Sequence, residues 1–239
     1  MGAVPELTFP DRFLWGTATA AHQIEGGNVN NDWWAMEHDP TSGCVDVSGD
    51  ACDSFNRYPE DIALIADLGL GAYRFSLEWS RIEPEEGEFS LVALDHYRRM
   101  AAACHEAGIL PVVTFHHFTH PRWMAAAGAW EALHAADRFA RYCEKVTEHL
   151  GDLIGMACTL NEPNVVAKMG WRLGLFPPQL HFTVQQAHLD HVMNPQQHLR
   201  EVERFADKIL RARLKRPELV IRLGGLHEHG EIASGFDFL

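Results

Sequence analysis

Short apolar runs alternate with longer segments of helical periodicity through most of this sequence. The runs with strand character are residues 13–17, 72–77, 110–115 and 156–160. Helical periodicity is found in residues 59–68, from Ser90 as a cap to about residue 107, and in residues 134–150. Strands that alternate with helices form parallel sheets, because a parallel connection needs a crossover that a helix supplies. The alternation therefore predicts an α/β protein made of repeated βα units.

A glycine ends each of the three helical segments. Gly69, Gly108 and Gly151 stand where the helical pattern stops, and glycine readily adopts the left-handed conformation that closes a helix. A charged helix at about residues 199–215 and a strand-like run at 219–223 follow later in the chain. In all, the sequence offers about five to six βα units, whereas a closed (β/α)8 (TIM) barrel has eight. We predict an incomplete barrel that forms a single domain over residues 1–239.

Charge and hydrophobicity exclude two classes of partner. The 33 acidic and 20 basic residues give a formal net charge of -13, so we expect no phosphate-neutralising surface and no nucleic-acid partner. No apolar run approaches the roughly 18 to 20 residues of a membrane helix, and the first residues lack the pattern of a signal peptide. We therefore expect no membrane partner. The five cysteines include no C-x-x-C pair and are interpreted as reduced thiols, which favours a cytoplasmic location.

Polar residues stand at the carboxyl ends of the four clearest strands, where (β/α) barrels place reactive side chains. These candidates are Gln23 and Glu25 after the first strand, Arg74 and Glu78 at the second, His116 and His117 at the third, and Asn161 and Glu162 at the fourth. In a regular strand Arg74 and Glu78 would share one face, because side chains alternate.

Glu162 is the strongest candidate for chemistry. It directly follows an apolar strand, precedes Pro163 and has amide neighbours in Asn161 and Asn164 that suit hydroxyl groups. We expect its carboxyl to be partly buried, which would raise its pKa toward the value that a general acid needs at neutral pH. The alternative, equally compatible with position alone, is a glutamate that only complements a helix dipole.

The H-H-x-x-H cluster of His116, His117 and His120 raises the question of a metal site. Its spacing differs from H-E-x-x-H, and the segment has strand character and runs into Pro121, so we expect neither a metal nor another cofactor. Neutral imidazoles that hydrogen-bond a polyhydroxylated ligand fit a strand end better. Aromatic residues near the strand ends, among them Trp33 and Phe118, could stack on sugar rings or pack in the core.

Four blocks of the sequence resemble glycoside hydrolase family 1, the β-glucosidase-like retaining β-glycosidases. The blocks are residues 13–26 (FLWGTATAAHQIEG), 73–82 (YRFSLEWSRI), 111–123 and 159–164 (TLNEPN), and they occur in the family's order. The resemblance extends over residues 1–178, and residues 179–239 are divergent or truncated. The sequence is thus similar to the N-terminal portion of the family's proteins.

The resemblance implies retaining hydrolysis of β-glycosidic bonds by two glutamates that flank the scissile bond. Glu162 matches the general acid/base, and Asn161 matches the amide that binds the sugar 2-hydroxyl. Gln23 and His117 match residues that bind other sugar hydroxyls, and Arg74 matches the arginine that orients the nucleophilic glutamate. The implied partner is a small β-glycoside or oligosaccharide.

The largest departure from the family is that its nucleophile block, Thr-Glu-Asn-Gly, is absent from residues 1–239. We therefore expect little turnover by this chain alone, and either self-association or pairing with a complementary half-barrel, because a half-barrel leaves strand edges unpaired. The alternative is a non-catalytic sugar-binding or assembly module derived from the barrel. A third hypothesis, a metal-dependent hydrolase built on the histidines, would require bound zinc.

Overall fold

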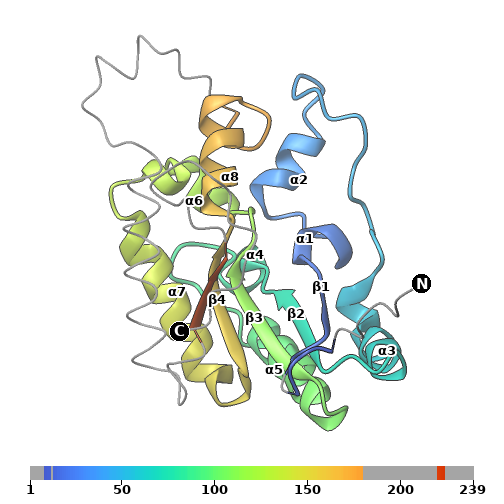
Figure 1. Cartoon of the computed structure of the whole chain (residues 1–239). Coiled ribbons are helices and arrows are strands. Elements are labelled where there is room, and N and C mark those ends of the chain that lie inside the picture. Colours follow the sequence, from blue (N-terminus) through green and yellow to red (C-terminus); the bar gives the residue numbers. More distant parts are fainter. Residues whose placement is uncertain (1–7, 12, 180–219, 224–239) are drawn as a thin grey trace.

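The computed structural model describes residues 8–11, 13–179 and 220–223 of the chain. Its centre is a parallel sheet in the order β1-β2-β3-β4-β5 (Figure 1). The strands are β1 (Gly16–Ala18), β2 (Ala72–Ser76), β3 (Leu110–His116), β4 (Met156–Asn161) and β5 (Val220–Leu223). Every neighbouring pair runs parallel. This sheet confirms the predicted α/β fold as an incomplete barrel.

Three long helices cover the outer face of the sheet, and the shorter ones, except the one directly before β4, lie beyond the carboxyl ends of the strands (Figure 1). The long helices are α3 (Ser54–Asp67), α5 (Leu91–Glu106) and α7 (Ala135–Leu150). The short elements are α1 (Ala21–Ile24), α2 (Asp32–Glu37), α4 (Trp79–Ile82), α6 (Arg122–Ala126), η1 (Ala129–Glu131), η2 (Gly151–Leu153), α8 (Pro163–Val166) and η3 (Ala167–Arg172).

Local signals in the sequence explain where helices α5 and α7 begin and end. The Ser90 side chain accepts a hydrogen bond from the Ala93 amide at 3.2 Å, which caps α5 as predicted. Gly108 follows α5 with φ of +71°, a left-handed conformation that ends the helix at little steric cost. Helix α7 occupies the predicted segment, with His134 at its N-cap.

Two predicted boundaries were wrong. Helix α3 begins at Ser54 and contains Pro59, whereas the sequence interpretation started it at the proline, as is usual for a first helical turn. Strand β1 covers only Gly16–Ala18, and the apolar run before it lies exposed instead of in the sheet. The predicted helix at residues 199–215 lies outside the described residues, and the division at residue 178 stays a prediction.

The sheet separates a large hydrophobic cluster from a small one. The large cluster lies between the sheet and the helices and includes Tyr73 and Phe75 of β2, each 1% exposed. The small cluster consists of Ala72, Val112, Met156 and Cys158. Because side chains alternate along a strand, Arg74 shares the face of Ala72 and not that of Tyr73. The inner face of the sheet therefore carries a charged residue next to its small apolar cluster.

Candidate active site

A chain of hydrogen bonds links Arg74, Asn161 and Glu162 across the inner face of the sheet. The Arg74 guanidinium donates from Nε to Thr114 Oγ1 at 2.9 Å and from Nη2 to Asn161 Oδ1 at 2.6 Å. Asn161 Nδ2 in turn donates to Glu162 Oε2 at 3.3 Å. Since arginine is only a donor, it fixes the amide oxygen of Asn161 toward itself and turns the amide NH2 toward Glu162. The orientation of this amide is thus determined by strand β2.

An irregularity in strand β4 places Asn161 in this chain. Met156 and Cys158 belong to the inner face, so regular alternation would turn Asn161 toward the helices. The pairing of β4 with β5 shifts register between Cys158 and Asn161. An extra residue of this kind re-aims the side chains that follow it. Asn161 therefore faces Arg74, and its side chain is buried although it is polar.

Glu162 has a backbone conformation that few residues other than glycine adopt. Its φ of 46° and ψ of 58° are left-handed, and it is the N-cap residue of α8, whose first residue is Pro163. The right-handed helical conformation is disfavoured before a proline, so the chain turns here between strand and helix. Left-handed residues other than glycine cost about 1–3 kcal/mol and concentrate at functional sites. The conformation supports a role for this residue beyond capping a helix.

The expectation that Glu162 is partly buried was wrong for the described part of the chain. The residue is exposed, and within residues 8–179 the hydrogen bond from Asn161 is the contact made by its carboxyl group. The physical reason is its position: the left-handed turn carries the carboxyl past the end of β4, beyond the side chains that bury the strand. Asn161, one residue earlier, is 4% exposed.

His117 lies at the end of β3 and is half-buried. Burial, together with the nearby positive charge of Arg74, lowers the pKa of its imidazole to about 3. The ring is therefore neutral at neutral pH, the form expected for a hydrogen-bonding imidazole. The next residue, Phe118, is left-handed with φ of 73° and contacts the His117 ring edge-on at 4.8 Å between centroids. A left-handed residue thus follows each of strands β3 and β4 within two positions of the strand's end.

Gln23 lies on the short helix α1 and is exposed. The Ala21 amide donates to Ser76 Oγ at 2.7 Å, which fastens α1 to the end of β2. His22 is held from two sides, by Glu37 at 2.8 Å and by Asn31 at 3.0 Å. Among the described residues, no hydrogen bond joins the Gln23 side chain to the other predicted site residues. The structure brings Arg74, Asn161, Glu162 and His117 together, whereas Gln23 is positioned by the attachment of α1 to the end of β2.

A buried ionic network behind strand β2 was not identified from the sequence. Glu25 accepts hydrogen bonds from Tyr97 Oη at 2.7 Å and from Arg81 Nε at 3.0 Å. Burial raises the pKa of the Glu25 carboxyl from 4.5 to about 7, although the Arg81 charge opposes the rise. Glu78 does not share a face with Arg74, because β2 ends at Ser76 and the Glu78 side chain caps α4. Both glutamates therefore support the scaffold.

The three histidines of the H-H-x-x-H segment do not converge. His116 and His120 are each 1% exposed and pack against Trp130, whereas His117 lies near Arg74. In the described part of the chain, no group of three or more histidine, cysteine, aspartate or glutamate residues has the geometry to hold a metal ion. The zinc-dependent hypothesis therefore has no site among these residues.

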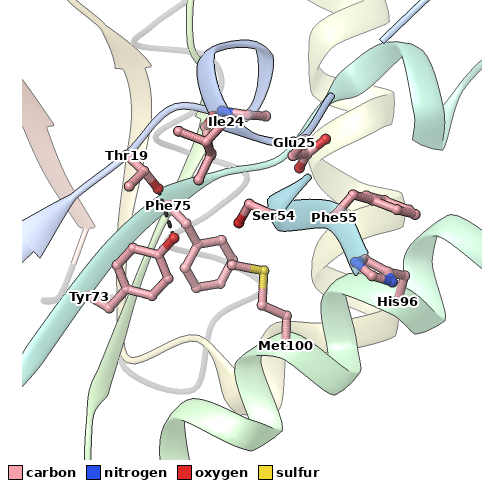
Figure 2. A pocket seen from close by; sticks show the side chains of 11 residues that line it. Thr19, Ile24, Glu25, Ser54, Phe55, Tyr73, Phe75, His96 and Met100 are labelled. Carbon is pink, nitrogen blue, oxygen red and sulfur yellow. Dashed lines mark hydrogen bonds between the residues drawn. The ribbon is translucent and has the colours of Figure 1, made fainter. Parts of the chain in front are cut away.

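A small pocket lies apart from the candidate site, on the other face of β2 (Figure 2). Tyr73 and Phe75 point into it from the strand, and His96 and Met100 line it from α5. The Thr19 hydroxyl and Tyr73 Oη lie 2.8 Å apart at its edge. Arg74 points away from this pocket, because it lies between Tyr73 and Phe75 in the strand. The pocket belongs to the packing between the sheet and the helices.

Three aromatic side chains from separate segments meet beside His117. The ring centroids of Trp33 and Phe176 are 4.7 Å apart, and those of Phe118 and Phe176 are 5.5 Å apart. They come from helix α2, from the segment after β3 and from the segment after η3. The sequence pointed to Trp33 and Phe118 as aromatic residues near strand ends but gave no reason to pair them with Phe176.

No helix in the part of the chain that the structure describes is long and apolar enough to cross a membrane. The described residues form no disulfide: the thiols of Cys104, Cys143 and Cys158 are buried, whereas those of Cys44 and Cys52 are exposed. The cytoplasmic location stays a prediction.

Parallel βα units with polar side chains gathered at the carboxyl ends of the strands define the class of (β/α)-barrel enzyme sites. The model of glycosyl hydrolase family 1 matches residues 6–216. The chain therefore belongs to glycosyl hydrolase family 1, as the sequence blocks implied.

Curated relatives agree with the family match. The chain is 38% identical over 180 residues to Beta-glucosidase A of Acetivibrio thermocellus, a match that covers 72% of this chain and 40% of the relative. It is 41% identical over 177 residues to Beta-glucosidase A of Thermotoga maritima, covering 71% of this chain and 40% of the relative. The matched region thus spans about 40% of the length of these relatives.

Solved structures show the same fold. A beta-glucosidase from Thermotoga maritima in complex with glucoimidazole superposes with a TM-score of 0.82 at 35% identity, covering 90% of this chain and 49% of that one. A beta-glycosidase from Pyrococcus horikoshii gives a TM-score of 0.80 at 35% identity, covering 91% of this chain and 48% of that one.

Proposed function

We propose that this chain carries the acid/base part of a site for retaining hydrolysis of β-glycosides. The observation that supports the proposal most strongly is the hydrogen-bond chain Arg74–Asn161–Glu162, which orients an amide and an exposed carboxyl at the carboxyl end of the sheet. Relatives named beta-glucosidase share the family. The substrate class is a small β-glycoside or oligosaccharide, and neither a metal nor another cofactor takes part.

In the proposed reaction Glu162 first gives its proton to the glycosidic oxygen as the bond to the anomeric carbon breaks. A second carboxylate, about 5 to 5.5 Å from the first, forms the covalent intermediate in a retaining mechanism. Glu162 then takes a proton from water, which attacks the anomeric carbon and releases the second carboxylate. Asn161 has a second amide hydrogen beyond the one donated to Glu162, and we assign it to a sugar hydroxyl.

The remaining predicted residues have roles that fit their surroundings. The neutral ring of His117 can donate or accept a hydrogen bond without adding positive charge near the anomeric centre. Gln23 is exposed at the end of β1, where its amide can reach a further hydroxyl. Arg74 presents a guanidinium on the inner face that can pair with the nucleophilic carboxylate as well as with Asn161.

The nucleophile in this proposal comes from polypeptide outside residues 1–239 that completes the barrel. The exposed cluster of Phe9, Phe13 and Trp15 beside β1 supports such pairing, because its ring centroids lie within 4.9 Å of one another and each side chain is at least 46% exposed. Exposed apolar clusters of this kind mark contact surfaces. Strand β1 is also the edge of the described sheet.

The test is release of nitrophenol from a panel of nitrophenyl β-glycosides by the 239-residue chain, with and without the carboxyl-terminal half of a family relative. We expect little turnover alone and a gain on mixing that a Glu162→Gln control abolishes. Sugar binding without any gain would favour the alternative of a non-catalytic sugar-binding module. Turnover by the chain alone that depends on Glu162 would show that a carboxylate within residues 1–239 is the nucleophile.

A further inference from the structure

Three buried rings beneath the end of strand β3 carry polar atoms without a partner. The ring centroids of His116 and His120 are 4.8 Å apart, and each lies within 5.1 Å of the Trp130 ring. All three side chains are 1% exposed. Both ring nitrogens of His116, Nε2 of His120 and Nε1 of Trp130 lack a hydrogen-bond partner in the described part of the chain. A buried polar group left unpaired costs about 1–3 kcal/mol, so four such atoms in one place need an explanation.

Asp32 determines which nitrogen of His120 is the acceptor. The aspartate accepts from the His120 amide at 2.9 Å through Oδ1 and faces His120 Nδ1 at 2.9 Å through Oδ2. A carboxylate can only accept, so the proton of the neutral ring is on Nδ1. In the neutral ring His120 Nε2 is then a buried acceptor, within the ring cluster that His120 forms with His116 and Trp130.

The donors and acceptors of the three rings complement those of one water molecule. Trp130 offers one N–H donor, His120 one acceptor, and the neutral His116 ring one of each, of which only one can face a given water because the two ring nitrogens point in different directions. Burial, reinforced by the neighbouring His120 and His117, lowers the pKa of His116 well below its usual range, which keeps this ring neutral. A water molecule donates twice and accepts twice, and buried waters typically make about three hydrogen bonds to such groups.

We propose that His116, His120 and Trp130 form a buried site for an ordered water molecule, which ties the end of β3 to helix α2 through Asp32. The site is distinct from the proposed glycoside site, and the inference does not depend on hydrolysis. Metal-bound histidines also commonly donate a hydrogen bond from their other ring nitrogen to a carboxylate, as His120 does to Asp32. Trp130 argues against a metal, because its N–H can donate to water but cannot ligate a cation.

The direct test is a crystal structure of the full chain at high resolution, with anomalous data collected at the zinc and copper edges. We expect one density peak at hydrogen-bond distance from His120 Nε2 and from at least one atom of the other two rings, without anomalous signal. An anomalous peak would overturn the proposal in favour of a metal. Direct ring-to-ring hydrogen bonds without a peak would also overturn it.

A thermodynamic cycle tests the same site in solution. His116→Phe and Trp130→Phe each remove groups that the water would bond, and we expect each to raise the unfolding equilibrium constant about tenfold. If one water serves both rings, the double variant should raise it much less than hundredfold, because the second change removes a partner already lost. Phe139→Leu, which alters only packing in the same cluster, is the control for lost volume. A full hundredfold effect of the double variant would contradict the shared water.

Discussion

Two polar regions flank strand β2, and they are built in opposite ways. Behind the strand, Glu25 is buried and bonded to both Tyr97 and Arg81. In front of it, Glu162 is exposed and held by the hydrogen bond from Asn161. Buried charges persist only when they are paired, whereas a reactive carboxyl must leave lone pairs available to its substrate. The contrast separates glutamates that maintain the fold from the one that we assign to chemistry.

The largest expected difference between the two regions comes from removing one arginine at a time. Arg81→Met leaves Glu25 buried without its cation, a change that costs about 3–5 kcal/mol in comparable cases. Arg74→Met, the matched control on the inner face, removes hydrogen bonds to the neutral Thr114 and Asn161, and should cost about 1–3 kcal/mol. Urea unfolding of both variants measures the two costs. Equal losses of unfolding free energy in the two variants would contradict the distinction between a buried ionic region behind β2 and an open polar region in front of it.

Tyr97→Phe tests the same buried network with a smaller change. The phenol donates to Glu25 and accepts from the Glu78 amide at 3.0 Å, so its loss unpairs two buried groups. We expect the free energy of unfolding to fall by about 1–3 kcal/mol. The control is Tyr58→Phe, which retains the ring at a partly buried position of α3. It should change the free energy of unfolding by less than about 0.5 kcal/mol.

Glu25 should make its own contribution to the pH dependence of stability. Its pKa rises from 4.5 to about 7 on folding, so the folded state holds this proton more tightly than the unfolded state. The contribution is fully present below pH 4.5 and is lost as the pH rises toward 7. Glu25→Gln should remove that loss between pH 4.5 and 7, measured as the difference between the urea midpoints of variant and parent. If the urea midpoints of variant and parent changed with pH in the same way, the pH-dependent contribution would not come from Glu25.

The smallest effect on folding is expected at the residue with the largest proposed effect on chemistry. Glu162→Gln should change the free energy of unfolding by less than about 0.5 kcal/mol, because the exposed carboxyl has a single side-chain hydrogen bond among the described residues. Thermal unfolding of the variant beside its parent checks this. A loss above about 2 kcal/mol would mean that Glu162 belongs to the scaffold, like Glu25.

Much of the scaffold could be predicted because its signals are local. Ser90 and Gly108 mark the two ends of α5 within a few residues of the helix, and apolar runs mark the central strands. Pro59 misled the same reasoning, because a proline usually marks a first turn and here lies inside α3.

The candidate site was predicted residue by residue from the family resemblance, but its geometry was not. The left-handed turn at Glu162 and its exposure follow from how β4 meets Pro163, which no periodicity encodes. The pair of Asp32 and His120 joins residues 88 positions apart, and such contacts have no local signal. The network of Glu25, Arg81 and Tyr97 is of the same kind, since it forms only when α1, α4 and α5 pack together.

The register shift in β4 makes the site sensitive to strand length as well as to residue identity. Deleting one residue between Cys158 and Asn161 would restore regular alternation and leave an apolar strand that still fits the sheet. After that deletion Asn161 would stand two positions after Cys158 and would still face Arg74, whereas deleting two residues would turn it away from Arg74 and release Glu162 from its amide neighbour. A protein engineer who shortened this strand by two residues could therefore keep an apolar framework while erasing the alignment of its reactive groups.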